Sequence, residues 1–196
     1  MLEVWMSDIL CLSETWLTPK CIIDSHLEVN DFLLFRHDRP EGLHDGVMLY
    51  AKNTLNCRRR TDLEHEKVEC IVLELIFQRD KHLFFFCYRP SNQSPDFFFE
   101  TLSTKLALAE AEQAVISVIG GFNAKHRSWE STSLRNRDAA GTKFYGILLD
   151  FSLTQCIDSP TRYSKDGTNS STLDLYATAR PDLVNKIVAG DLVSDP

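Results

Sequence analysis

The sequence predicts an α/β fold in which two packed sheets are flanked by helices. Apolar segments of strand length recur along the whole chain, and only two segments show helical periodicity. Many strands with few helices between them favour sheets packed face to face with helices outside them. No repeat, low-complexity tract or linker divides the chain, and 196 residues are enough for one domain with a sizeable core.

The apolar runs predict the strands. Residues 82–88 (HLFFFCY) are aromatic and continuous, as expected for a central strand that is buried on both faces. Residues 68–77 alternate with period two, and residues 115–119 (VISVI) form a buried run that leads into two glycines. Further strands are predicted at residues 8–13, 46–52, 172–177 and 187–192.

Two segments predict helices. Ser94 is a favourable N-cap, Pro95 suits the first helical position and Asp96 complements the positive N-terminal end of the helix. Apolar residues then recur at helical spacing to about residue 113. A second helix is predicted at residues 142–151, where apolar residues again share one face.

Composition restricts the classes of function. The net charge of −7 weighs against a protein that holds nucleic acid by bulk positive charge. It is compatible with a divalent-metal site, which needs a local surplus of carboxylates. No apolar run approaches the roughly 18 residues of a membrane span, and the first residues lack the basic start of a secretory signal. We therefore expect an intracellular protein, nuclear or cytoplasmic and not secreted, that has no membrane partner.

Two compositional features need a structural interpretation. The six cysteines form no C-x-x-C pair, which favours buried free thiols in a reducing compartment over a zinc site. The basic run Arg58-Arg59-Arg60 fits either contact with a nucleic-acid backbone or an exposed turn.

Polar residues follow or flank four of the predicted strands, where α/β folds usually build their sites. Glu14 could bind a metal or simply be solvated. Tyr88 could contact a phosphate or pack in the core. Asn123 follows the glycine pair and could meet a ligand or lie in a plain turn, while Asp174 could orient a catalytic group or cap a strand.

Taken together and in this order, the segments resemble the endonuclease/exonuclease/phosphatase superfamily, which has the DNase I-like fold. Within it, they resemble the endonuclease domain of jockey-like non-LTR (LINE-type) retrotransposons. The matching motifs are LSETWL at residues 12–17, RHDR at 36–39, DGV at 45–47, YRP at 88–90, GGFNAKH at 120–126 with Trp129, Thr161 with Ser171 and Asp174, and SD at 194–195. The resemblance covers almost the whole chain.

The resemblance implies a four-layered α/β sandwich, with two packed and mostly antiparallel sheets flanked by helices. It implies a single domain over residues 1–196 that is truncated at both ends and lacks the N-terminal strand of the family. It further implies a phosphodiesterase that nicks DNA with Mg²⁺, or with Mn²⁺ as the alternative ion, and needs no small-molecule cofactor. The parent element is expected to carry a reverse transcriptase.

The resemblance also implies a role for each matching residue. Glu14 corresponds to the metal ligand. The residues implied to be catalytic, because they contact or position the phosphate, the attacking water or the final histidine of the family, are Tyr88, Asn123, Asp174 and Asp195. The residues implied to bind substrate are Arg89, Thr161, Ser171 and His126.

Three departures from the family pattern predict a catalytically impaired domain. Gly121 replaces the aspartate that aligns the water, Pro196 replaces the final histidine, and the strand that bears an asparagine ligand has no counterpart before Glu14. General acid–base help contributes about 10²–10⁴-fold to a rate and an electrostatic donor about 10²–10³-fold. We therefore expect a decayed copy of the nuclease or an incomplete gene model.

Two alternative functions remain. The first is a non-catalytic remnant of the same fold that binds nucleic acid or protein. The second is a phosphatase or lipid phosphodiesterase of the superfamily, which the YRP and NAKH segments argue against because they match the retrotransposon branch.

Overall fold

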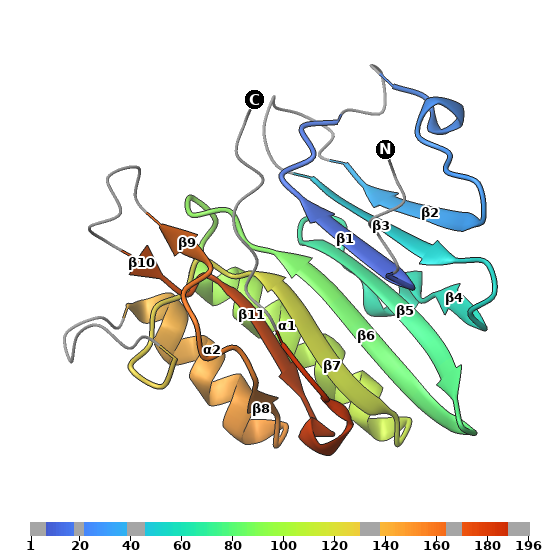
Figure 1. The fold of residues 1–196 in the computed structure, drawn as a ribbon. Coiled ribbons are helices and arrows are strands. Elements are labelled where there is room, and N and C mark those ends of the chain that lie inside the picture. The colour runs from blue at the N-terminus through green and yellow to red at the C-terminus, as the bar shows by residue number, and fades with distance from the viewer. Residues whose placement is uncertain (1–6, 18–21, 39–45, 130–137, 164–169, 188–196) are drawn as a thin grey trace.

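The computed structural model of the chain describes residues 7–17, 22–38, 46–129, 138–163 and 170–187. A six-stranded sheet in the order β4-β5-β6-β7-β11-β8 forms its centre (Figure 1). Neighbouring strands are antiparallel except β6 and β7, which are parallel. The strands are β4 (Cys57–Arg59), β5 (Glu69–Phe77), β6 (Asp80–Tyr88), β7 (Val115–Gly121), β11 (Asp174–Thr178) and β8 (Thr154–Gln155).

A second, antiparallel sheet of three strands, in the order β1-β3-β2, packs against one face of the first. Its strands are β1 (Ile9–Ser13), β3 (Val47–Lys52) and β2 (Phe32–His37). The remaining described elements are the paired short strands β9 (Arg162–Tyr163) and β10 (Ser170–Ser171), and the short 3-10 helices η1 (Asp24–His26), η2 (Thr61–Leu63) and η3 (Pro181–Leu183).

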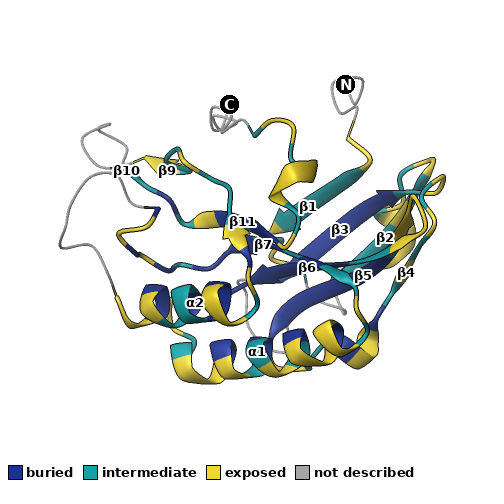
Figure 2. Ribbon diagram, turned by 90° about the horizontal axis from the view of Figure 1, so that it is seen from below, coloured by how far each residue is buried: buried dark blue, intermediate teal, exposed yellow. Residues whose placement is uncertain are grey.

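Two α-helices, α1 (Pro95–Ala111) and α2 (Ala139–Asp150), cover the opposite face of the six-stranded sheet (Figure 2). Helix α1 provides the crossover that the parallel neighbours β6 and β7 require. As predicted, Ser94 caps α1, and its side chain accepts a hydrogen bond from the Phe97 amide. Helix α2 begins three residues before its predicted start, because Asp138 caps it by accepting a hydrogen bond from the Gly141 amide at 2.6 Å.

Two apolar clusters separate the layers. The cluster between the helices and the six-stranded sheet contains Phe122 and Phe144, whose rings stack with centroids 4.4 Å apart. The cluster between the two sheets contains Leu49, Ile71 and Leu73. Strands β5 and β6 therefore bury both faces, which explains why residues 82–88 are continuously apolar. Two packed, mostly antiparallel sheets with flanking helices confirm the predicted fold class, and the described α-helices supply the layer on one outer face.

The structure contains strands at all but one of the predicted segments, with small shifts at their ends. The exception, at residues 187–192, lies outside the described residues apart from Ile187, which belongs to no strand. Strand β2 (FLLFRH) was not predicted, and the shorter strands carry too little pattern to be recognised. No helix among the described residues is both long enough and apolar enough to cross a membrane.

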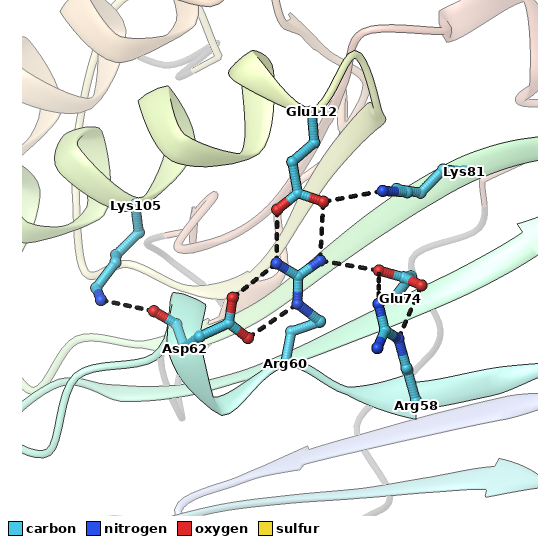
Figure 3. Close-up of polar contacts among 7 residues, drawn as sticks. All are labelled: Arg58, Arg60, Asp62, Glu74, Lys81, Lys105 and Glu112. Atoms are coloured by element: carbon cyan, nitrogen blue, oxygen red, sulfur yellow. Dashed lines mark hydrogen bonds and ion pairs between the residues drawn. The ribbon is translucent and has the colours of Figure 1, made fainter.

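The basic run does not form an exposed turn, because it lies in and just after the edge strand β4 and its arginines are ion-paired. Arg58 and Arg60 both pair with Glu74 of β5 at 2.8 Å. Arg60 also pairs at 2.5 Å with Glu112, which caps the C-terminal end of α1 (Figure 3). The arginine between them pairs with Glu64 at 2.8 Å. The run therefore ties the edge of the sheet to helix α1.

The five cysteines in the described part of the chain are free thiols. Cys70 and Cys87 face each other across β5 and β6, with their sulfur atoms 3.0 Å apart, and both are buried. Burial raises the pKa of the Cys70 thiol. Cys11, Cys57 and Cys156 are only partly buried. The prediction of free thiols is confirmed for these five residues, whereas full burial holds for two of them.

Candidate active site

Strands β6 and β7 end where β11 begins (Figure 1), and at this point three residues of the six-stranded sheet are paired side by side. Tyr88 is opposite Gly121, and Gly121 is opposite Asp174. The side chains of Tyr88 and Asp174 thus stand on either side of Gly121, on one face of the sheet. Glycine is required at the preceding position, because φ of Gly120 is 141° and a Cβ there would lie 1.7 Å from the Cys87 carbonyl oxygen.

Glu14 reaches this row from the three-stranded sheet. It follows β1 directly and has a φ of 55°, an uncommon conformation for a residue with a Cβ. Its carboxylate accepts a hydrogen bond from the Tyr88 hydroxyl. Glu14 follows β1 of the three-stranded sheet and Tyr88 ends β6 of the six-stranded sheet. Their contact, between residues 74 positions apart, therefore connects the two sheets at the candidate site.

The Asp174 carboxylate interacts electrostatically with Glu14. Partial burial raises the pKa of the Asp174 carboxyl, and the negative charge of Glu14 adds to the rise, while Thr161 and Arg162 oppose it. The Thr161 hydroxyl oxygen also accepts hydrogen bonds from the amides of Leu173 and Asp174, at 3.1 and 3.0 Å. These bonds fix the start of β11. Asp174 as a whole residue is exposed, so its carboxylate remains accessible to a ligand.

Arg89 holds the loop that carries Asn123. Its guanidinium is buried and donates to the carbonyl oxygens of Phe122 at 2.7 Å, Asn123 at 2.6 Å and Gln93 at 2.9 Å. The Asn123 side-chain amide donates in return to the Arg89 carbonyl oxygen at 2.8 Å. Asn123 has a φ of 45°, so this mutual bonding keeps the residue in an unusual backbone conformation. Burial lowers the pKa of Arg89.

The other residues expected to bind substrate lie on two sides of the row. Thr161 adjoins Asp174, and the Ser171 carbonyl oxygen accepts a hydrogen bond from the Thr161 amide at 3.0 Å. His126 is placed differently, because it is buried and its ring stacks on that of Tyr145 in α2 with the centroids 4.3 Å apart. The structure therefore places Thr161 next to Asp174, connects Ser171 to Thr161 through the backbone, and packs His126 against a helix.

Gly121 leaves room between two side chains of the row. A Cβ at this position would lie 3.1 Å from Oδ1 of Asp174 and 3.2 Å from the Tyr88 ring. An aspartate at position 121, which the family resemblance leads one to expect, would therefore add a carboxylate at the centre of the row. Asp195, expected to be catalytic, and Pro196 lie outside the described residues.

The carboxylates at the site fit a hard divalent cation. Within the described ranges, no three His, Cys, Asp or Glu side chains gather into a metal cage. Mg²⁺ does not require such a cage, because it usually keeps several waters and takes one or two carboxylates together with substrate phosphates. Glu14 and Asp174 provide two carboxylates, and burial together with the negative charge of Glu14 raises the pKa of Asp174. A bound cation would relieve the repulsion between the two carboxylates.

Glu69 is a buried carboxylate beside the row that the sequence analysis did not identify as a site residue. It is the first residue of β5, lies opposite Tyr88 and is 5% exposed. Its carboxylate accepts a hydrogen bond from the Gly46 amide at 2.8 Å. The sequence did carry a signal for Glu69, because it is a charged residue on the same strand face as the apolar residues Ile71 and Leu73. A carboxylate buried among apolar residues needs specific partners, which makes it a candidate for a site.

Comparisons with known proteins agree with this architecture. A family model described as endonuclease-reverse transcriptase matches residues 82–195. The solved endonuclease domain of TRAS1, a telomere-specific non-LTR retrotransposon, is 16% identical to the chain. It aligns with a TM-score of 0.59 over 76% of this chain and 68% of its own. No curated protein matches the chain significantly.

Two further solved structures share the fold. The AP endonuclease LMAP from Leishmania major is 14% identical, with a TM-score of 0.67 over 90% of this chain and 71% of its own. A 3′-5′ exonuclease from Neisseria meningitidis is 13% identical, with a TM-score of 0.63 over 88% of this chain and 76% of its own. These likenesses show a DNase I-like fold, and the family match extends over more than half of the chain. The chain therefore belongs to the endonuclease-reverse transcriptase family, a family of nucleases.

Proposed function

We propose that the chain is a Mg²⁺-dependent phosphodiesterase domain that nicks target DNA for a non-LTR retrotransposon, and that Gly121 weakens its chemistry. The observation that carries the proposal is the row of Tyr88, Gly121 and Asp174 on three adjacent strands, with Glu14 brought against Tyr88 from the other sheet. The packing of the two sheets does not require the carboxylates of Glu14 and Asp174 to interact at this point. A divalent metal that binds a phosphate does require carboxylate ligands. The work of such an element places the protein inside the cell, in the nucleus or the cytoplasm.

In this proposal the carboxylates of Glu14 and Asp174 hold the metal. When bound, Mg²⁺ or Mn²⁺ supplies positive charge to the phosphoryl oxygens of the DNA backbone. The Tyr88 hydroxyl orients the Glu14 carboxylate and is the candidate contact to the phosphate. Asn123, held by its bonds to Arg89, presents a preorganised amide to the same group.

Two of the residues expected to bind substrate take supporting roles instead. The guanidinium of Arg89 is already bonded to carbonyl oxygens, so it positions Asn123 from beneath the loop. The His126 ring stacks on Tyr145 and makes a tilted contact with Trp129, so it secures the segment after the loop against α2. Thr161 and Ser171 support the strand end that carries Asp174 and line the site.

The proposed impairment follows from position 121. Without a carboxylate between Tyr88 and Asp174, the site lacks the group that would align and deprotonate the attacking water. General-base help of this kind contributes about 10²–10⁴-fold to a rate. Position 196 is proline, which has no protonated ring to stabilise an oxyanion. The two losses act on one reaction and are not additive, so a residual metal-dependent activity is expected.

A plasmid-nicking assay tests the proposal. Purified protein is incubated with supercoiled plasmid in Mg²⁺, in Mn²⁺ and in EDTA, beside the variants Glu14→Gln and Asp174→Asn. We expect slow nicking that requires the metal and is lost in both variants. Nicking at the rate of an intact family member would refute the impairment. Nicking that survives Glu14→Gln would refute the assignment of the site.

The second candidate function is a non-catalytic remnant of the same fold that binds nucleic acid or protein, and Gly121 is the observation that favours it. Its sign would be binding to duplex DNA that does not need Mg²⁺ and weakens steeply with salt. The ion pairing of Arg58 and Arg60 and the net charge of −7 weigh against tight binding. A substrate panel of plasmid, abasic duplex and phosphoinositide also separates both functions from a lipid phosphodiesterase.

A further inference from the structure

The row of residues at the candidate site extends one strand further, to Glu69. Glu69 of β5 is opposite Tyr88 of β6, just as Tyr88 is opposite Gly121. Its side chain shares a strand face with Ile71 and Leu73, which pack between the two sheets. An apolar residue would fill this position at no cost in desolvation. A buried carboxylate here therefore needs a specific partner.

One partner of Glu69 is Gly46, at the point where the chain enters the other sheet. Oε2 of Glu69 accepts the Gly46 amide hydrogen at 2.8 Å, and Gly46 is followed directly by β3. The Gly46 carbonyl oxygen accepts the amide hydrogen of Thr15 at 3.3 Å, and Thr15 follows Glu14. Two hydrogen bonds thus connect Glu69 to the residue next to Glu14.

Gly46 also holds this connection at close range. Its φ is 92°, and a Cβ there would lie 2.8 Å from Oγ1 of Thr15. Only glycine lets the two chain segments approach each other in this way. The connection therefore depends on tertiary contacts between Glu69, Gly46 and Thr15 and does not arise from strand pairing alone.

We infer that Glu69 is a positioning residue of the candidate site: by holding the Gly46 amide it fixes the strand end that presents Glu14 to Tyr88. The inference rests on the proposed function, because Glu14 is there the metal ligand. Partners of metal ligands typically change metal affinity by about 10–100-fold when they are mutated. Glu69 acts on the metal through Glu14 and touches neither the metal nor the phosphate itself.

The test compares Glu69→Met, which keeps the length of the side chain but removes the strong acceptor, with Glu69→Gln, which keeps an acceptor oxygen. Amide hydrogen exchange is measured at Gly46 and Thr15, and Mn²⁺ affinity by calorimetry. We expect E69M to lose protection at both amides and to bind Mn²⁺ about 10-fold more weakly or worse. We expect E69Q to retain most of both properties.

Two controls separate positioning from general stability. Glu74→Met removes another buried glutamate from the same strand, at the end with the arginine ion pairs, and is expected to lower stability without changing Mn²⁺ affinity. In a Glu14→Gln background, E69M should lower Mn²⁺ affinity no further, because residues that act through one group are not additive. The inference is overturned by an equal loss in that background, or by E69Q behaving like E69M.

Failure of the proposed function gives a different result. If the wild-type chain binds no Mn²⁺ in a Glu14-dependent way, the metal assignment fails, and Glu69 is then judged on amide exchange alone. Unprotected exchange at Gly46 in the wild type, or unchanged protection in E69M, overturns the inference. If E69M does not fold, exchange at Gly46 in the wild type still tests the inference, because unprotected exchange there would overturn it.

Discussion

Replacing Gly121 by aspartate introduces a carboxylate at the centre of the candidate site. A Cβ at this position would lie 3.1 Å from Oδ1 of Asp174. Two carboxylates about 4 Å apart repel each other by about 4 kcal/mol at an effective dielectric constant of about 20. Burial and Glu14 already raise the pKa of Asp174 above its ordinary 3.8, and the new charge would raise it further.

The sign of the pH dependence follows from this raised pKa. The folded state then holds the Asp174 proton more tightly than the unfolded chain does. Stability therefore falls as the pH rises from the ordinary aspartate range through the folded pKa, and it stays low at neutral pH. For a chain of this size, about 1 kcal/mol corresponds to about 2–4 °C in Tm. In EDTA at neutral pH, Gly121→Asp should therefore unfold up to roughly 8–16 °C below the wild type.

Thermal unfolding in EDTA and in saturating MgCl₂ measures this effect, with Gly121→Asn as a control of the same size without charge. Mg²⁺ should restore more stability to G121D than to the wild type or G121N, because the ion binds only the folded site. Equal loss in G121D and G121N at neutral pH, or equal gains with Mg²⁺, would refute the electrostatic reasoning. Nicking activity should rise little in G121D, since position 196 is still proline.

Three further predictions concern the scaffold. Arg60→Met should lower the free energy of unfolding by about 3 kcal/mol at neutral pH, because it breaks the ion pairs with both Glu74 and Glu112. Hydrogen bonds from Arg60 and Lys81 lower the pKa of Glu112 from 4.5 to about 2. The stability that Arg60 gains by pairing with Glu112 should therefore be lost as the pH falls from 4.5 towards 2. The difference in Tm between the wild type and Arg60→Met should become smaller over this range. Arg89→Met should cost about 2–4 kcal/mol in urea unfolding, because it leaves several carbonyl oxygens without their donor; a cost close to zero would contradict its supporting role. A thiol reagent should modify the half-buried Cys57 and Cys156 in the native protein and reach Cys70 and Cys87 only on unfolding, as peptide mass spectrometry would show.

The sequence by itself determined the parts of the fold that depend on local pattern. The cap at Ser94 and the helical spacing after it predicted α1, and the aromatic run at residues 82–88 predicted a strand buried on both faces. The order of the motifs along the chain predicted the fold and the family, and the family match confirms this. Each of these signals lies within a short stretch of chain, where periodicity and capping act directly.

Only the tertiary structure decided which side chains meet. Arg60 pairs with Glu112 across 52 positions, and Tyr88 contacts Glu14 across 74. These contacts make the arginine run a link between the sheet edge and helix α1, and they make Tyr88 part of the candidate active site. In the sequence, Glu69 is only one residue on a face of an alternating strand. The packing of the two sheets brings its carboxylate to the Gly46 amide. A local pattern shows which face of an element is apolar, but the partner of a polar group is fixed by how distant elements pack together.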